Sequence, residues 1–236
     1  MQQQNEPNSK FLGKFSYLLA SLLTLLIGVA VGDNGRASAT ILCLLFAAVL
    51  LAAIATACRL HKTIRVGLAL AIPMLLVSIV AVYASDSPQV VLVHDVLAIA
   101  FFLFSSYHVL CAVLGDKQVT LDTIVGAICL YLLMGLVWTY LYSIIQTVDP
   151  SAFGLAPTVK ISSVSLPQTS GLQPLVYLSF VTMTTLGYGD IAPVSRLAQT
   201  ACYLQAVFGQ FFLAVLVARL VALYLASTTK LQEEHS

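Results

Sequence analysis

The sequence predicts an all-α membrane protein with six transmembrane helices in each chain. Of the 236 residues, 59% are hydrophobic and only 9% are charged, whereas soluble domains contain about 25% charged residues. The hydrophobic residues form long runs, and a run of about 20 apolar residues can cross a bilayer as a helix. The runs define six predicted spans, with limits near Phe15–Gly32, Ala37–Cys58, Val66–Ala84, Val90–Leu114, Leu121–Ile145 and Ala198–Ala226.

Two short tails flank these spans. Residues 1–14 precede the first span and residues 228–236 follow the last one, and we expect the second tail to leave no room for a folded regulatory domain. Two lysines, the first apolar run and then Ala37-Ser38-Ala39 occur in the order of a secretory signal peptide. The apolar run is longer than the core of a typical signal peptide, so we expect a retained helix instead.

The basic residues predict the orientation in the membrane. Cytoplasmic loops carry an excess of Lys and Arg. With the N-terminus in the cytoplasm, eight basic residues lie toward the inner side and three toward the outer side. The inner residues are Lys10, Lys14, Arg59, Lys62, Arg65, Lys117, Arg219 and Lys230, and the outer ones are Arg36, Lys160 and Arg196. We therefore expect a multi-pass protein of the plasma membrane, in contact with lipid, with both termini in the cytoplasm.

The segment Thr184-Thr185-Leu186-Gly187-Tyr188-Gly189-Asp190 lies between the fifth and sixth spans. Gly187 and Gly189 can adopt positive φ without a Cβ clash, which allows a backbone to alternate between ordinary and left-handed residues and to turn successive carbonyls toward one axis. The preceding stretch, Pro174–Thr184, is apolar but too short to span a bilayer. Non-helical backbone at membrane depth is tolerated only where protein buries it or where it lines a wet cavity. The pattern predicts a re-entrant helix followed by a pore-lining loop.

From Gly171 to about Ala226, the chain resembles the pore helix, selectivity filter and last membrane helix of potassium channels, and in particular the two-helix pore domain of bacterial channels. Leu186 stands where Val is commoner. The resemblance implies that K⁺ is the permeant ion and that backbone carbonyls replace its water. A closed ring needs four strands and the chain carries one such motif, so the resemblance also implies a homotetramer. The implied filter residues are Thr185, Leu186, Gly187, Tyr188 and Gly189, with the carbonyls of the first four as ligands of K⁺ and the Thr185 hydroxyl at the inner end.

The residues behind the filter depart from one known pattern. In some bacterial potassium channels a Glu of the pore helix pairs with the Asp after the filter, but the matching residue here is Val181. Tyr177 stands where an aromatic donor often reaches this Asp, so we predict a hydrogen bond from Tyr177 to Asp190. The resemblance thus assigns Thr184, Tyr177 and Asp190 to the support of the filter.

Gly209 lies 20 residues after Gly189, in the last predicted span. In potassium channels, a glycine at about this spacing is the hinge at which the inner helix bends. Glycine lowers the stiffness of a helix, and it also lets two helices cross closely. The sequence leaves open whether Gly209 is a gating hinge or a packing residue.

Residues 15–117 form a predicted four-helix bundle ahead of the pore domain, residues 118–227. This is the position of the voltage sensor in six-span channels, whose fourth span carries Arg or Lys at every third position because gating charge must lie in the electric field. The span Val90–Leu114 has neither residue. We therefore expect no strong voltage gating, whether the bundle is sensor-like or an unrelated accessory.

His94 and Asp95 lie in the outer third of the fourth span. An acid at that depth is costly and raises the hypothesis of a function. One hypothesis is a proton- or cation-responsive pair with Arg36 of the first outer loop. The simpler interpretation, which we prefer, is an acid near water at the start of a helix, favoured by the helix dipole.

The sequence therefore predicts a potassium-selective channel that conducts K⁺ passively. The alternatives are a poorly selective cation channel, which the presence of Tyr188 and Gly189 disfavours, and a non-conducting regulatory subunit, which the sequence does not exclude. A potassium-transporter subunit would carry four related repeats, and we find none. We expect no enzymatic activity, because His, Cys and paired carboxylates do not cluster, and a net charge of +1 gives no reason to expect nucleic acid as a partner.

Overall fold

A computed structural model describes most of the chain, and this part is mainly helical. The described residues are 13, 15–31, 41, 44–49, 51–53, 61–83, 87–115, 120–155 and 172–233. The named elements in this part are α1 (Ser16–Val31), α3 (His61–Tyr83), α4 (Pro88–Gly115), α5 (Leu121–Val148), β1 (Phe153–Leu155), α6 (Gln173–Met183), β2 (Ile191–Pro193) and α7 (Arg196–Glu233). Residues 44–49 and 51–53, within the second predicted span, are helical as well.

Among the helices that the structure describes, three are long and apolar enough to cross a membrane. They are α4, α5 and the first part of α7, up to Arg219. The first three predicted spans coincide, where the structure describes them, with the shorter apolar helices Ser16–Val31, Leu44–Ala53 and Arg65–Val80. A membrane-spanning role for these shorter helices stays a prediction. The short helix predicted ahead of the motif is present as α6.

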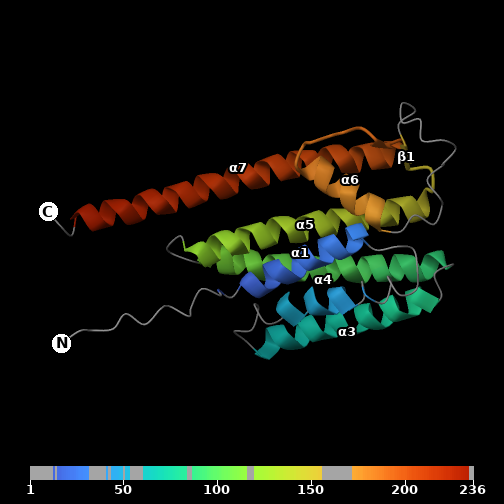
Figure 1. Cartoon of the computed structure of the whole chain (residues 1–236), viewed down its shortest axis with the longest axis horizontal. Helices are drawn as coiled ribbons and strands as arrows, with labels where there is room; N and C mark the ends of the chain where they lie inside the picture. Colours follow the sequence, from blue (N-terminus) through green and yellow to red (C-terminus); the bar gives the residue numbers. More distant parts are fainter. Residues whose placement is uncertain are drawn as a thin grey trace.

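The helices lie roughly side by side along the long axis of the molecule (Figure 1). The helix α5 occupies a central place, because α1, α4, α6 and α7 all pack against it. On the far side of α4 lies α3. The short α6 is wedged between α5 and α7. This arrangement puts α6 and the loop after it next to α7, and it separates them from α3 by α4 and α5.

Two contacts show which helix ends lie together. The backbone N–H of Phe15, just before α1, donates to Oδ1 of Asp122 at 3.2 Å, and Asp122 lies in the first turn of α5. The guanidinium of Arg219 in α7 donates to the carbonyl of Leu114, close to the end of α4. The starts of α1 and α5, the end of α4 and the Arg219 region of α7 therefore share one end of the molecule.

The opposite end carries the two strands. The Gln173 amide of α6 donates to the carbonyl of Ala30 at 3.2 Å, which ties α6 to the last turn of α1. The strands β1 and β2 pair antiparallel, with Phe153 opposite Pro193. This pairing ties the segment that follows α5 to the segment that precedes α7, so α6 and its loop are held from both sides.

A close helix contact at Gly126 fixes α5 against its neighbours. A Cβ at this position would lie 2.8 Å from a methyl carbon of Val113 in α4 and 3.0 Å from the ring of Phe15, closer than side chains normally approach. The N-terminus of α5 is fixed by a capping box, in which Thr120 and Thr123 each accept a hydrogen bond from the other's backbone N–H. The start of α5 is thus locked to α1 and α4.

The Gly126→Ala substitution tests this contact. We expect it to lower the melting temperature, because overpacking costs about 1–3 kcal/mol and exceeds the gain of roughly 1 kcal/mol from replacing a helical glycine. The measurement is thermal unfolding of the purified chain in detergent. Gly115→Ala is the matched control, because no atom lies within 4 Å of its added Cβ. Equal melting temperatures for the two variants would contradict the packing at Gly126.

Candidate functional site

The helix α6 ends in a motif that reverses the chain. Thr185 adopts a left-handed conformation with φ 58°, and its N–H donates to the Thr182 carbonyl at 3.0 Å. The next N–H, of Leu186, donates to the Val181 carbonyl at 2.9 Å. These two bonds form a Schellman motif, in which the left-handed residue is usually Gly. Placing a Thr there costs roughly 1–2 kcal/mol, so the surrounding structure has to hold it.

The loop after α6 alternates between left-handed and ordinary residues. Thr185, Gly187 and Gly189 have φ of 58°, 54° and 74°, and Leu186 and Tyr188 between them do not have positive φ. The two left-handed glycines match the sequence prediction. The left-handed Thr185 was not predicted, because β-branched residues are rarely found in this region. Alternation of this kind turns successive peptide carbonyls toward one side of the chain.

The hydroxyl groups of the two threonines differ in their use. The Thr184 hydroxyl donates to the Phe180 carbonyl at 2.7 Å, which ties it back to α6. The Thr185 hydroxyl donates to the Thr184 carbonyl at 2.7 Å. Because the single proton of the Thr185 hydroxyl is directed to the backbone, its oxygen presents lone pairs, which is the form that binds a cation.

One chain leaves this loop open. Leu186 is 54% exposed and Tyr188 is 68% exposed, although both are large side chains in a protein of this hydrophobicity. A Cβ added at Gly187 or Gly189 would have no neighbour within 4 Å. Within one chain, the loop is therefore covered on the side that faces α6, and its other side is exposed.

The predicted hydrogen bond behind the loop is present. The Tyr177 hydroxyl donates to Oδ2 of Asp190 at 2.7 Å. This bond raises the pKa of Tyr177 to about 12, because the carboxylate favours the protonated phenol, so the donor stays protonated at physiological pH. Asp190 directly precedes β2, and the bond therefore joins the first half of α6 to the end of the loop. Val181 has an apolar, buried side chain and offers Asp190 no carboxyl partner.

A buried polar network holds α6 between α5 and α7, and the sequence analysis missed it. The Gln205 amide of α7 donates to the Ser179 hydroxyl at 2.8 Å and to the Ser179 carbonyl at 3.0 Å. The Ser179 hydroxyl donates to the Gly135 carbonyl of α5 at 2.7 Å, and the Tyr142 hydroxyl donates to Oε1 of Gln205. The side chains of Ser179, Gln205 and Tyr142 are fully buried. The sequence did contain an indication of this network, because the amide of Gln205 lies in the middle of an apolar span, where a polar side chain needs a hydrogen-bond partner.

Two glycines allow the close approach that this network needs. A Cβ at Gly209 in α7 would lie 2.5 Å from the carbonyl oxygen of Met183, and one at Gly135 in α5 would lie 2.6 Å from the ring of Phe180. Both distances are too short for any real Cβ. The packing role of Gly209 is therefore explained by its contact with the end of α6, and its role as a hinge stays a prediction.

The network can be tested with a double-mutant cycle on Gln205→Leu and Ser179→Ala. Each single change leaves a buried polar group unsatisfied, and we expect it to cost about 1–3 kcal/mol. The double variant should cost less than the sum, with a coupling of about 1 kcal/mol in a membrane protein. Thermal or denaturant unfolding in detergent measures both. Gln210→Leu is the control, because Gln210 also lies in α7 and its side chain is exposed. If the effects of Gln205→Leu and Ser179→Ala were strictly additive, the contact between the two side chains would not stabilise the fold.

The comparisons with known proteins concern the same part of the chain. A family model described as "Ion channel" matches residues 118–226, which contain α5, α6, the loop and the first part of α7. A curated relative, Protein LctB of Bacillus caldotenax, is 30% identical over 107 residues, which are 45% of this chain and 76% of the relative. No solved structure gives a significant match. Together with the apolar helices that surround the site, this similarity shows that the chain is a membrane protein of the ion channel family.

Proposed function

We propose that the protein is a homotetrameric potassium channel and that Thr185–Gly189 is its selectivity filter. The observation that carries the proposal is the alternation of φ through this segment. A K⁺ ion in a narrow pore must exchange its water for oxygen ligands of similar energy, and rings of backbone carbonyls provide them. The carbonyls of Thr185, Leu186, Gly187 and Tyr188 are the proposed ligands, and the Thr185 hydroxyl adds oxygens at the inner end.

The open loop supports the tetramer. One chain supplies one strand of carbonyls, whereas dehydration of an ion requires oxygens on all sides. The exposed side chains of Leu186 and Tyr188 and the exposed apolar face of α7 provide the surface on which further copies would pack. That face includes Tyr203, Leu204, Val207, Phe211 and Val215. A four-fold ring of identical chains closes without leaving unpaired surface.

The contacts around α6 support a rigid filter. Tyr177 and Asp190 brace its outer end, and Gln205 with Ser179 braces the middle of α6. A filter that holds its carbonyls at a fixed number and spacing fits K⁺ better than a smaller ion. The filter would thus rely on hydrogen bonds of α6 with neighbours on both sides, and Val181 contributes only its backbone to this scaffold.

The helices ahead of the pore unit support passive conduction without strong voltage gating. The helix α4 has no Arg or Lys. Because moving one charge through 100 mV changes the free energy by about 2.3 kcal/mol, a movement of α4 without such charges would depend little on the membrane potential. The shared end of α1, α5 and the Arg219 region of α7 agrees with cytoplasmic termini in the plasma membrane. The basic residues predict the same orientation.

Flux through the purified protein in liposomes tests the proposal. We expect K⁺ flux down a K⁺ gradient, little Na⁺ flux down a Na⁺ gradient, and block by Ba²⁺, which matches K⁺ in size. Equal K⁺ and Na⁺ flux would favour a poorly selective cation channel. Absence of flux from well-folded tetramers, at any pH and in any lipid tried, would favour a non-conducting regulatory subunit.

Gly187→Ala tests the filter itself. With φ of 54°, an L-residue at this position pays roughly 1–2 kcal/mol in a left-handed conformation. The space around the added Cβ is open within the chain, so the effect is one of backbone conformation. We expect the ratio of K⁺ to Na⁺ flux to fall at least about tenfold, the equivalent of 1.4 kcal/mol. Gly115→Ala is the control, and unchanged selectivity in Gly187→Ala would reject this segment as the filter.

A further inference from the structure

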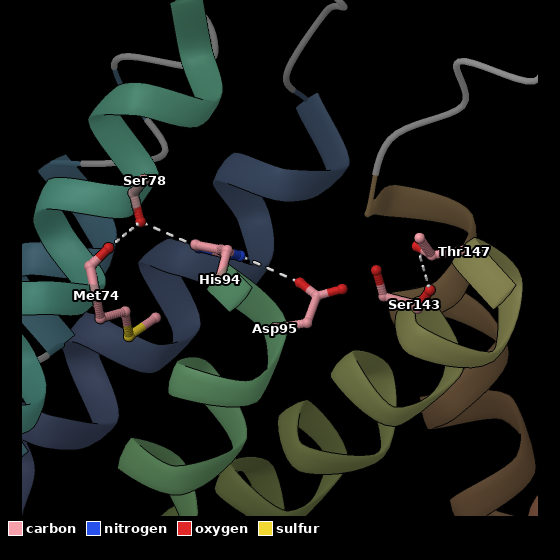
Figure 2. Close-up of polar contacts among 6 residues, drawn as sticks. All are labelled: Met74, Ser78, His94, Asp95, Ser143 and Thr147. Atoms are coloured by element: carbon pink, nitrogen blue, oxygen red, sulfur yellow. Dashed lines mark hydrogen bonds and ion pairs between the residues drawn. The ribbon is translucent and has the colours of Figure 1, made fainter. Parts of the chain in front are cut away.

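A buried ionisable pair lies in α4, away from the filter segment. The side chain of Asp95 is 3% exposed and that of His94 is 18% exposed, with Nδ1 of His94 3.1 Å from Oδ1 of Asp95. On the other side of the ring, Nε2 lies 3.0 Å from the Ser78 hydroxyl of α3 (Figure 2). The preferred sequence interpretation, an acid near water at a helix start, is wrong, because Asp95 lies seven residues after Pro88 and is covered by protein.

The hydrogen bonds determine where the protons of this pair lie. The Ser78 hydroxyl donates to the Met74 carbonyl at 2.7 Å, so its only proton is used and its oxygen must accept from Nε2–H of His94. Nδ1 then faces the carboxyl of Asp95, and two acceptors at 3.1 Å need a proton between them. The pair therefore holds one shared proton, on Nδ1 or on Oδ1, and its total charge is zero in either case.

The neighbouring helices offer little to balance a net charge. From α5, the titratable group that faces the pair is the Tyr140 phenol, whose ring centroid lies 5.7 Å from that of His94. From the middle of α3, the polar partner is Ser78, and the helical residues 44–49 and 51–53 carry no ionisable side chain. Among the described residues, Asp95 forms its ion pair with His94 and with no Lys or Arg. Arg36, the partner considered in the sequence analysis, lies outside the described residues.

The second carboxyl oxygen faces α5. Oδ2 of Asp95 is buried and accepts no hydrogen bond from the described residues. Figure 2 shows Ser143 of α5 on the side of the Asp95 carboxyl, with Thr147 one turn further along. The Thr147 hydroxyl donates to the Ser143 carbonyl at 2.8 Å and so is occupied within α5. A carboxylate that lost the shared proton would thus be buried against α5 with an unsatisfied oxygen, a costly state.

We propose that the His94–Asp95 pair is a proton-binding site that controls the packing of α4 on α5. With the shared proton bound, the pair is neutral and α3, α4 and α5 pack closely. When the pH rises, the shared proton is released to water and the charge of the pair falls from zero to −1. One oxygen of the carboxylate then faces the lone pair of Nδ1, and the other faces the side chains of α5. Because α5 also carries the contacts of Gly135 and Tyr142 with α6 and α7, a shift of α5 changes the support of the filter.

The proton site is tested on the full chain in detergent by thermal unfolding at a series of pH values. A site that binds its proton in the folded state stabilises the fold at low pH and loses that contribution as the pH rises, so the wild-type melting temperature should fall. Asp95→Asn keeps the shape and supplies an N–H for Nδ1 without a shared proton, so the fall should be lost. His108→Asn, on the same helix, is the control and should retain it.

Equal pH profiles for wild type and Asp95→Asn would overturn the proposal. If this variant does not fold, Asp95→Ser serves instead, since its hydroxyl can donate to Nδ1 of His94 and it has no carboxyl to titrate, and a retained fall would again overturn the proposal. A second arm measures K⁺ flux in liposomes at the same pH values and rests on the proposed channel function. Flux should change with pH in wild type and not in Asp95→Asn. A pH-dependent melting temperature with pH-independent flux would reject the coupling to the pore, whereas no K⁺ flux at any pH would contradict the channel and leave the proton site standing.

Discussion

The backbone conformation of Thr185–Gly189 is the constraint that the surrounding helices have to satisfy. Three left-handed residues in five leave this segment in neither helix nor strand, and its described backbone hydrogen bonds reach back only to the last turn of α6. A left-handed Thr costs roughly 1–2 kcal/mol, which glycine would not. A segment with few bonds of its own and an unfavourable residue keeps its shape only if its surroundings are rigid.

The surroundings act on α6 at three levels. A Schellman motif fixes its end, Gln205 and Ser179 fix its middle, and the Tyr177–Asp190 bond joins its first half to the end of the loop. Each net hydrogen bond contributes on the order of 1 kcal/mol, which is of the size needed to offset the strain. Because these bonds come from α5, α6 and α7, the conformation of the loop depends on how all three helices pack. The buried pair at His94 contacts the same α5 through Tyr140, and this contact is the proposed route from α3 and α4 to the filter.

The sequence was sufficient for the elements that depend on local pattern. Apolar runs located the helices, and two glycines after a short apolar stretch located the loop. The Tyr177–Asp190 bond was predicted from the resemblance to potassium channels. It was insufficient where the outcome depended on which helix faces which. The left-handed conformation of Thr185 results from the Schellman motif that ends α6, whereas threonine itself disfavours this conformation. The Gln205 network and the burial of Asp95 require the packing of α4 and α7 on α5, which periodicity does not give in helices that are apolar on every face.

The most direct test of the central claim is a cryo-electron microscopy structure of the purified protein in lipid nanodiscs with K⁺, repeated with Na⁺ in its place. We expect four chains around one axis, the carbonyls of Thr185–Tyr188 facing that axis, and density for ions between them in K⁺. An assembly in which these segments do not meet, or a K⁺ structure whose segments meet but hold no ion density, would contradict the assignment of Thr185–Gly189 as a selectivity filter.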